Sequence, residues 1–257
     1  MSSSSIPAGE SRRLTIWNAS VGVLHLVQAT LILVIANDAS LPIYASWVDG
    51  PPATAVPILG EPIIDLPIGL AVAAFLYLAA ADHLIVASPF ARPWYERNLA
   101  RGINYARWWE YSISASLMVV LIAMLAGTRE LTALVAIFGA SAAMILFGLL
   151  MERGSRPGRD ADLWPFWLGT AVGLVPWIAI GIQLVRAQAE AAVPGFVFAI
   201  FVSLLLLFAL FPINMYLQYK RIGPWRDYLY GERAYILLSL TAKSALAWQV
   251  FGGALAG

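Results

Sequence analysis

A single lysine stands in the middle of the last long apolar run of the sequence. Lys243 is the only formal charge between Ala234 and Leu255. At about 1.5 Å of rise per residue it lies roughly 15 Å beyond Glu232 and Arg233, near the centre of a bilayer. A bare ammonium at that depth costs at least about 2.5–3.5 kcal/mol, and a lysine stem is too short to reach water easily. A Schiff base between this nitrogen and a bound aldehyde is the leading explanation for such a charge.

A positive nitrogen in hydrocarbon needs a paired anion, and Glu110 is the best candidate. Ser239 lies one turn before Lys243 on the same helical face, so its hydroxyl can hydrogen-bond near the nitrogen. For Glu110 the alternative is an interfacial salt bridge with Arg107, three residues earlier.

Two histidines and an aspartate add ionisable groups at membrane depth. Glu110 and His83 each lie about 10 Å from the same end of the bundle, and His25 lies nearer the middle. The alternative for His25 is a core imidazole bonded to Gln28, and for His83 a membrane-edge pair with Asp82. The other half of the bundle has no such group, so we expect any proton chemistry on one side only.

Deep aromatic side chains could enclose a flat apolar ligand. Trp177, Phe208 and Trp248 lie far from the predicted helix ends, although ordinary helix packing explains each of them equally well. Three other tryptophans near helix ends are typical of an interfacial belt: Trp94, Trp164 and Trp225.

The composition indicates that these groups are held by a bundle of membrane-spanning helices. Apolar residues make up 60% of the 257 residues and charged residues 12%. Without cysteine, and with two histidines, a disulfide, a thiolate or histidine-rich metal centre and a cysteine nucleophile are excluded. We expect no removable signal peptide in the polar N-terminal segment. Seven apolar runs are long enough to span: 14–36, 66–88, 103–127, 131–151, 163–185, 195–219 and 234–255.

The connections refine this picture. Only Thr128, Arg129 and Glu130 separate the third and fourth runs, which predicts a tight antiparallel helix pair. In segment 37–65, prolines and short β-prone pieces alternate, which predicts a small β-hairpin over the bundle. Pro176 and Pro212 fall inside predicted helices and should kink them, which makes room for a ligand. The sequence contains no internal repeat, which argues against an inverted-repeat transporter.

Positive charge is distributed very unevenly between the two ends of the predicted bundle. One end has only Arg129 and Arg186. The other end has thirteen: Arg12, Arg13, Arg92, Arg97, Arg101, Arg107, Arg153, Arg156, Arg159, Lys220, Arg221, Arg226 and Arg233. The positive-inside rule predicts a cytoplasmic N-terminus, with a tail over 1–13, a membrane domain over 14–257 and an extracellular loop over 37–65.

Several motifs give the chain a family resemblance over nearly its whole length. They are His25-Leu26-Val27-Gln28, Gly50-Pro51-Pro52, Arg107-Trp108-Trp109-Glu110-Tyr111-Ser112, Met144-Ile145-Leu146-Phe147-Gly148, Pro165-Phe166-Trp167, Val175-Pro176-Trp177 and Gly231-Glu232-Arg233-Ala234-Tyr235, which leads to Ser239 and Lys243. The chain resembles the heliorhodopsins, retinal proteins similar to microbial rhodopsins but inverted in the membrane. The resemblance implies an all-α, seven-transmembrane-helix rhodopsin-like bundle in the plasma membrane, forming a homodimer.

The resemblance also implies roles for individual residues. Lys243 would carry all-trans-retinal as a Schiff base, Glu110 would be the counterion, and a polar cytoplasmic-side cavity would involve His25 and His83. Further positions of the implied retinal pocket are Tyr111, Met144, Trp167, Trp177, Phe208, Ser239 and Trp248. Further positions of the implied cavity are Gln28, Asp82 and Arg107.

Two positions depart from the family pattern. Ala79 stands where some relatives have a serine near the counterion, so that hydrogen bond would come from Ser239, Ser114 or water. Asp82 stands where an aromatic residue is common, which adds a possible proton site.

A light-driven proton pump or a light-gated channel is the main alternative to a light sensor. Outward pumps generally carry a second carboxylate further along the helix of the counterion, where this chain has Leu121, and an aspartate four residues before the lysine, where it has Ser239. A second alternative is a non-photochemical receptor or lipid-modifying protein in which Lys243 is structural. We expect a non-enzymatic light sensor that contacts membrane lipids, signals to a cytoplasmic partner and moves no net charge.

Overall fold

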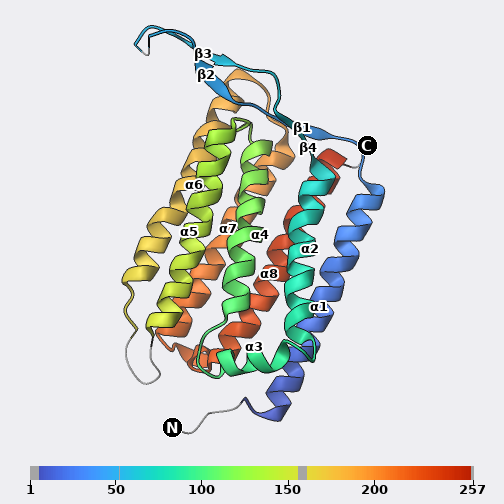
Figure 1. The fold of residues 1–257 in the computed structure, drawn as a ribbon, viewed down its shortest axis with the longest axis vertical. Helices are drawn as coiled ribbons and strands as arrows, with labels where there is room; N and C mark the ends of the chain where they lie inside the picture. The colour runs from blue at the N-terminus through green and yellow to red at the C-terminus, as the bar shows by residue number, and fades with distance from the viewer. Residues whose placement is uncertain (1–5, 52, 156–160, 256–257) are drawn as a thin grey trace.

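Seven helices long and apolar enough to cross a membrane form a single bundle in the computed structural model, which describes residues 6–51, 53–155 and 161–255 (Figure 1). The spans are α1 (Ala8–Ile35), α2 (Ile68–Ala87), α4 (Tyr105–Leu125), α5 (Leu131–Gly154), α6 (Trp164–Glu190), α7 (Gly195–Tyr219) and α8 (Tyr228–Val250), which continues into the π-helical η2 (Phe251–Leu255). The seven-span, all-α prediction is confirmed, and Pro176 and Pro212 lie inside α6 and α7. Arg156 and Arg159, counted in the charge argument, lie outside the described residues.

The helices extend further into the polar sequence than the apolar runs predicted. The helix α1 begins at Ala8 instead of residue 14, and α6 continues five residues past the predicted residue 185. These extra turns contain good helix formers such as Glu10 and Gln188, which continue a helix into water although they do not raise its hydropathy. The short helix α3 (Arg92–Leu99) and the 3-10 turn η1 (Gly223–Arg226) were not predicted, and α3 lies across the N-terminal end of the bundle (Figure 1).

The predicted hairpin between α1 and α2 is present as two consecutive pairs of antiparallel strands. The outer pair joins β1 (Ser40–Ile43) to β4 (Ile64–Pro67), and the inner pair joins β2 (Ser46–Val48) to β3 (Pro57–Leu59). It extends over the end of the bundle opposite the N-terminus (Figure 1). Two backbone hydrogen bonds attach it to the α4–α5 turn, from Tyr44 N to Arg129 O (2.9 Å) and from Leu131 N to Tyr44 O (2.8 Å).

Glu130 strengthens this attachment because its carboxylate joins the hairpin to the first turn of α5. It accepts hydrogen bonds from Thr132 N (2.7 Å), Ala133 N (3.2 Å) and Ser46 N (3.2 Å), and also from the Thr132 hydroxyl. These bonds favour the ionised form, with the Thr132 hydroxyl contributing most, and lower the pKa of Glu130 to about 2.

We therefore expect the attachment to be stable to acid. A carboxyl with a lowered folded-state pKa stabilises the folded form fully above its ordinary pKa near 4.5, and the contribution is lost as pH falls toward about 2. The protection factors for hydrogen exchange of the Thr132 and Ser46 amides should stay constant down to about pH 4 and fall below it. In Glu130→Gln that acid-dependent fall should disappear, whereas a fall at the same pH in the variant would contradict the assignment.

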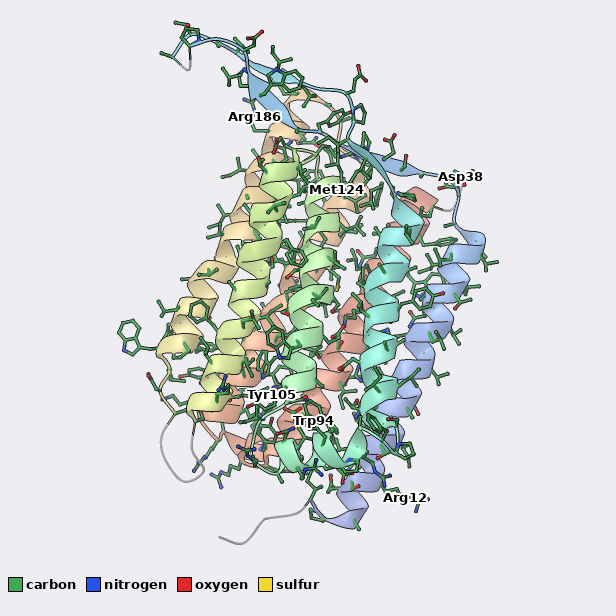
Figure 2. The ribbon with its side chains drawn as sticks, in the orientation of Figure 1. Arg12, Asp38, Trp94, Tyr105, Met124 and Arg186 are labelled. Atoms are coloured by element: carbon green, nitrogen blue, oxygen red, sulfur yellow. The ribbon has the colours of Figure 1, made fainter. Side chains whose placement is uncertain are left out.

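The hydrophobic core fills the half of the bundle that lies under the hairpin. Fully buried apolar side chains from α1, α2, α4, α7 and α8 meet there, among them Ile32, Phe75, Ile122, Ile200 and Leu246. The end of α8 meets the first connection of the chain at this surface, since Asn37 N donates to Leu255 O (3.3 Å). Figure 2 shows Asp38 and Arg186 at this end and Arg12 and Trp94 at the other. We call these the hairpin end and the N-terminal end.

Candidate functional site

Lys243 and Glu110 form a buried ion pair in the interior of the bundle. The lysine Nζ, on α8, lies 2.7 Å and 3.0 Å from the two carboxylate oxygens of Glu110, on α4. The two side chains are only 3% and 6% exposed. The ring of Tyr111 lies beside the pair, with its centroid 5.1 Å from Nζ. The structure therefore places together the two groups that the sequence paired.

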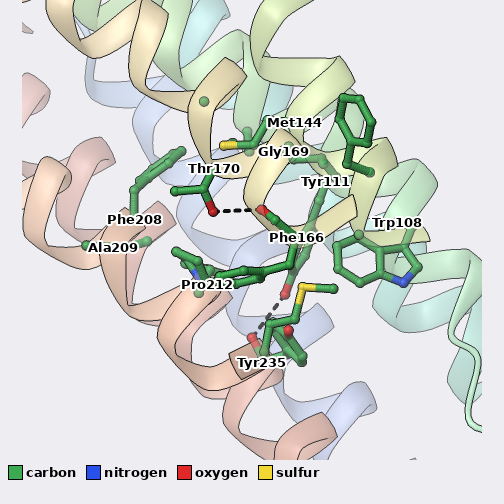
Figure 3. Close-up of a pocket in the computed structure, with 18 of the residues that line it drawn as sticks. Trp108, Tyr111, Met144, Phe166, Gly169, Thr170, Phe208, Ala209, Pro212 and Tyr235 are labelled. Atoms are coloured by element: carbon green, nitrogen blue, oxygen red, sulfur yellow. Dashed lines mark hydrogen bonds between the residues drawn. The ribbon is translucent and has the colours of Figure 1, made fainter. Parts of the chain in front are cut away.

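An apolar cavity of about 260 Å³ opens onto Lys243. It lies between α4, α5, α6, α7 and α8, and Figure 3 shows part of its wall. Six of the residues predicted for a ligand pocket line it: Tyr111, Met144, Trp177, Phe208, Ser239 and Lys243. Its lining also includes aromatic and proline side chains that were not predicted: Trp108, Pro165, Phe166, Phe211, Pro212 and Tyr235.

Glycines on α5 and α6 allow the walls of this cavity to pack closely. A Cβ at Gly173 would lie 2.1 Å from Met144 Sδ, and a Cβ at Gly148 would lie 2.3 Å from the ring of Trp108. Such separations are impossible for real atoms, so only glycine permits Met144 and Trp108 to take their places in the wall.

Two tryptophans predicted for the pocket do not line the cavity. Trp167 is 55% exposed on α6, and Trp248 is partly exposed on α8 with its Nε1 donating to Gln28 Oε1 (2.9 Å). Helical geometry explains both positions, because Trp167 is about 80° around the helix from Trp177, and Trp248 is about 140° around from Lys243. Ser114 is fully buried with no hydrogen-bond partner in the described chain, and it does not line the cavity either.

The two histidines stack on each other in the interior. Their ring centroids are 5.9 Å apart with an interplanar angle of 16°. His83 Nδ1 lies 2.7 Å from Asn18 Oδ1, whereas neither ring nitrogen of His25 has a partner within the described residues. Within the described residues, His25 therefore makes no hydrogen bond to Gln28, and His83 makes neither a hydrogen bond nor a salt bridge to Asp82.

A second, smaller cavity lies toward the N-terminal end. Its volume of about 10 Å³ is close to the space for one water. Its polar lining residues come from α1, α2, α3, α4 with its N-cap residue Asn104, and α8: Asn18, Asp82, His83, Tyr95, Asn104, Arg107, Tyr111, Glu232 and Tyr235. Burial raises the pKa of the Tyr95 phenol above its ordinary value, so this hydroxyl remains a hydrogen-bond donor.

Two tyrosines form a wall shared by the two cavities. Tyr111 and Tyr235 line both, and the Tyr111 hydroxyl donates to Tyr235 O (3.0 Å; Figure 3). One pair of side chains therefore separates the cavity at Lys243 from the polar cavity.

Arg107 is bound by two carboxylates that the sequence reasoning did not place in the interior. Its guanidinium contacts Glu232 on α8 and lies 2.5 Å from Glu152 on α5, and all three side chains are almost completely buried. Glu152 also accepts from Trp108 Nε1 (2.6 Å) and from Asn104 N (2.8 Å). Arg107 is thus engaged away from Glu110, which leaves that carboxylate to Lys243.

The spacing of apolar residues could have revealed Glu152. It follows Ile145, Gly148 and Leu149 by seven, four and three residues, and all of these are buried on one face of α5. Because Arg153 follows Glu152, the sequence there looks like an exposed, charged helix end. Arg233, which follows Glu232, has the same effect.

Comparisons with solved structures identify the architecture. A light-driven proton pump LR (Mac) from Leptosphaeria maculans is similar with a TM-score of 0.62 and 16% identity, covering 96% of each chain. A thermophilic rhodopsin from Rubrobacter xylanophilus is similar with a TM-score of 0.61 and 17% identity, covering 93% of this chain and 95% of that one. At these identities the similarity establishes the microbial rhodopsin fold and nothing finer. A comparison with curated proteins gives no significant match.

A comparison with protein-family models identifies a family, whereas the structural neighbours identify only the fold. The heliorhodopsin model matches residues 14–255, which include every membrane span except the first turns of α1. The match agrees with a buried lysine that faces an apolar cavity inside seven helices. The chain therefore belongs to the heliorhodopsin family of light-responsive, retinal-binding membrane proteins.

Proposed function

We propose that this protein is a light sensor in which Lys243 carries all-trans-retinal and Glu110 is the counterion. The observation that supports this most directly is the buried pair, with Nζ 2.7 Å from Glu110 and bordering an apolar cavity. A lysine that only served packing would have no reason to face a cavity, and an apolar residue would fill the position at lower cost.

The residues of the cavity fit retinal. Its lining is almost entirely apolar and aromatic, and Trp177 and Phe208 present rings at 5.4 Å between centroids. The Ser239 hydroxyl is buried without a partner in the described chain, one turn from Lys243, where it can accept or donate a bond near the nitrogen. Bound as a protonated Schiff base at Lys243 Nζ, retinal would supply light absorption and photoisomerisation.

The chain's own groups would then control one proton. Glu110 holds it on Nζ in the dark by direct charge pairing. After light absorption Nζ would release it toward the stacked pair His25 and His83 and toward Asp82, and His83 and Asp82 line the small cavity at the N-terminal end. Neutral His25 has one acceptor nitrogen, and neither of its ring nitrogens has a partner among the described residues, so it can take up a proton.

The hairpin-end half of the bundle opposes passage of the proton. Among the described residues of the spans beyond Lys243 in that direction, the only charged groups are Arg186 and Glu190, a mainly exposed pair 3.7 Å apart at the end of α6. The polar groups that remain are neutral, such as Gln249, which accepts from Ser203. A proton crossing this core would be an uncompensated charge in an apolar medium.

We therefore expect illumination to move no net charge across the membrane. The test is to record photocurrent and light-induced pH change in liposomes containing the retinal-loaded protein, with and without a protonophore. Transient signals that return to baseline would agree with a proton confined to one side. A sustained, protonophore-sensitive pH change would replace the sensor with a pump, and a steady current along an imposed ion gradient would replace it with a channel.

Substitution of the counterion should change the colour. Glu110→Gln removes the negative charge next to Nζ, so the protonated form should be less stable and its absorption should move to longer wavelength. Absorption spectra over a pH series measure both effects. Glu96→Gln, a partly exposed carboxyl in α3, is the matched control and should leave the spectrum unchanged. An unaltered spectrum in Glu110→Gln would transfer the counterion role to another acid, with Asp82 the first to test.

The orientation, assembly and output of the sensor belong to the same proposal. The excess of arginine at the N-terminal end supports a cytoplasmic N-terminus in the plasma membrane, with the tail over 1–13 inside, the retinal domain over 14–257 and the hairpin loop over 37–65 outside. We propose a homodimer and a cytoplasmic signalling partner at the basic surface, for which the family resemblance is the support. Nothing in this scheme requires an enzymatic reaction.

A further inference from the structure

The helix α3 lies across the N-terminal end of the bundle with one face buried and one face exposed. Tyr95, Asn98 and Leu99 point inward, and Tyr95 reaches the small polar cavity. One further helical turn is hydrogen-bonded at each end of α3. Arg92 N donates to Ser88 O before it, and Arg101 N donates to Asn98 O after it, each at 2.9 Å. The residues that are not buried therefore cover the other side of the helix.

One line of residues along this side consists of two aromatic rings followed by two arginines. Phe90, Trp94, Arg97 and Arg101 succeed one another at intervals of four, three and four residues, which is the spacing of one helical face. Phe90 is 95% exposed and Trp94 42% exposed. We refer to these four residues as the α3 stripe.

Positive charge on the stripe is not neutralised by the protein. Neither Arg97 nor Arg101 makes a salt bridge within residues 6–51, 53–155 and 161–255, whereas the acids nearby have partners. Glu96 accepts from the Ser11 hydroxyl and lies 3.6 Å from Arg92, and Glu10 lies 2.5 Å from Arg233. The bond between Ser11 and Glu96 also attaches α3 to α1 next to the exposed Arg12 and Arg13.

The position of the stripe identifies what it meets. The spanning helix α2 ends at Ala87, three residues before Phe90, so the aromatic part of the stripe lies at the edge of the bilayer. Contact with acyl chains would remove the exposed ring of Phe90 from water, which is energetically favourable. Aromatic rings followed by arginines also match the order of the membrane layers, from the apolar interior through the interface to the phosphates. A soluble acidic partner would satisfy the arginines and leave Phe90 in water.

We infer that the α3 stripe binds anionic phospholipids of the N-terminal-side leaflet, with Phe90 and Trp94 in the interfacial layer and Arg97 and Arg101 on the headgroup phosphates. The inference depends on the membrane-spanning fold and is independent of retinal and of proton transfer. Each basic residue near an anionic surface is worth about fivefold in binding, so the two arginines together should give a preference of roughly 25-fold.

The absence of cysteine allows a specific test. A Phe90→Cys variant takes a single thiol-reactive bimane, whose ring replaces the phenyl group, and is reconstituted in phosphatidylcholine nanodiscs. Brominated phosphatidylglycerol or brominated phosphatidylcholine, added at the same low fraction, reports which lipid resides at the dye by quenching it. The same dye at Val34, an exposed apolar position near the hairpin end of α1, is the reference site.

Phosphatidylglycerol should quench the Phe90 dye at a much lower fraction than phosphatidylcholine, with no such difference at Val34. Addition of Arg97→Gln and Arg101→Gln should remove most of the preference, as should high salt, whereas Arg186→Gln at the opposite end should preserve it. Equal quenching by the two lipids, or a preference that survives the double substitution, would overturn the inference. Absence of quenching by both would place the stripe in water and indicate a soluble partner instead.

Discussion

Lys243→Ala is expected to remove visible absorption completely when retinal is supplied. The chain has two lysines, and the other, Lys220, is exposed at the end of α7, whereas Lys243 faces the apolar cavity. No other amine in the interior can form the covalent bond, so retinal would remain free or bind without the shifted band of a protonated Schiff base. An absorption spectrum of purified protein measures the result directly.

Loss of colour through misfolding must be separated from loss of the attachment site. Lys243→Ala leaves Glu110 as an unpaired buried charge, which is itself strongly destabilising. The double variant Lys243→Ala/Glu110→Gln removes that charge and should remain folded and colourless. Lys220→Ala should retain the full band. A visible band in either Lys243 variant would contradict the assignment.

Arg107→Leu is expected to lower the free energy of unfolding by about 3–5 kcal/mol, because it leaves two buried carboxylates without their cation. Its guanidinium joins α4 to α5 through Glu152 and to α8 through Glu232, and it lies 3.9 Å above the ring of Tyr235. Arg107→Lys should retain only part of this stability, since one ammonium cannot bind both carboxylates with the forked geometry of a guanidinium. Denaturant unfolding in detergent, followed by loss of the visible band, gives the values.

The matched control is Arg92→Leu. Arg92 also pairs with a glutamate, at 3.6 Å, but its side chain is 45% exposed, and such surface pairs contribute at most about 1 kcal/mol. A triple variant with leucine at Arg107, Glu152 and Glu232 should recover much of the lost stability, because it removes all three charges together. Equal effects of Arg107→Leu and Arg92→Leu would show that burial does not govern the strength of the Arg107 cluster.

The parts of this architecture that hydropathy controls were predictable from the sequence. A run of about twenty apolar residues has only one stable state in a bilayer, so the seven spans followed directly. The same reasoning isolates Lys243 and Glu110, because a charge within such a run must find a partner. For α3 the signal fails, since eight residues with three charges look like a loop to any measure of hydropathy.

The partners and orientations of side chains depended on helix packing that no local pattern encodes. Arg107 could pair with Glu110, three residues away, or with acids 45 and 125 residues away, and only the crossing of α4 with α5 and α8 selects the distant pair. Trp167 and Trp177 occupy the same helix with similar hydropathy, and the rotation of α6 exposes the first to lipid and the second to the cavity.

The contact between Asn37 and Leu255 has a consequence for biosynthesis. Membrane helices are inserted from the N-terminus onward, so α8 emerges from the ribosome last, yet it is the helix whose end closes against the first connection of the chain. Until it arrives, Glu110 has no lysine and Arg107 lacks one of its carboxylates. A nascent chain that stalls before α8 therefore retains unmatched charges in the bilayer, and cellular quality control has a physical basis for distinguishing it from the finished protein.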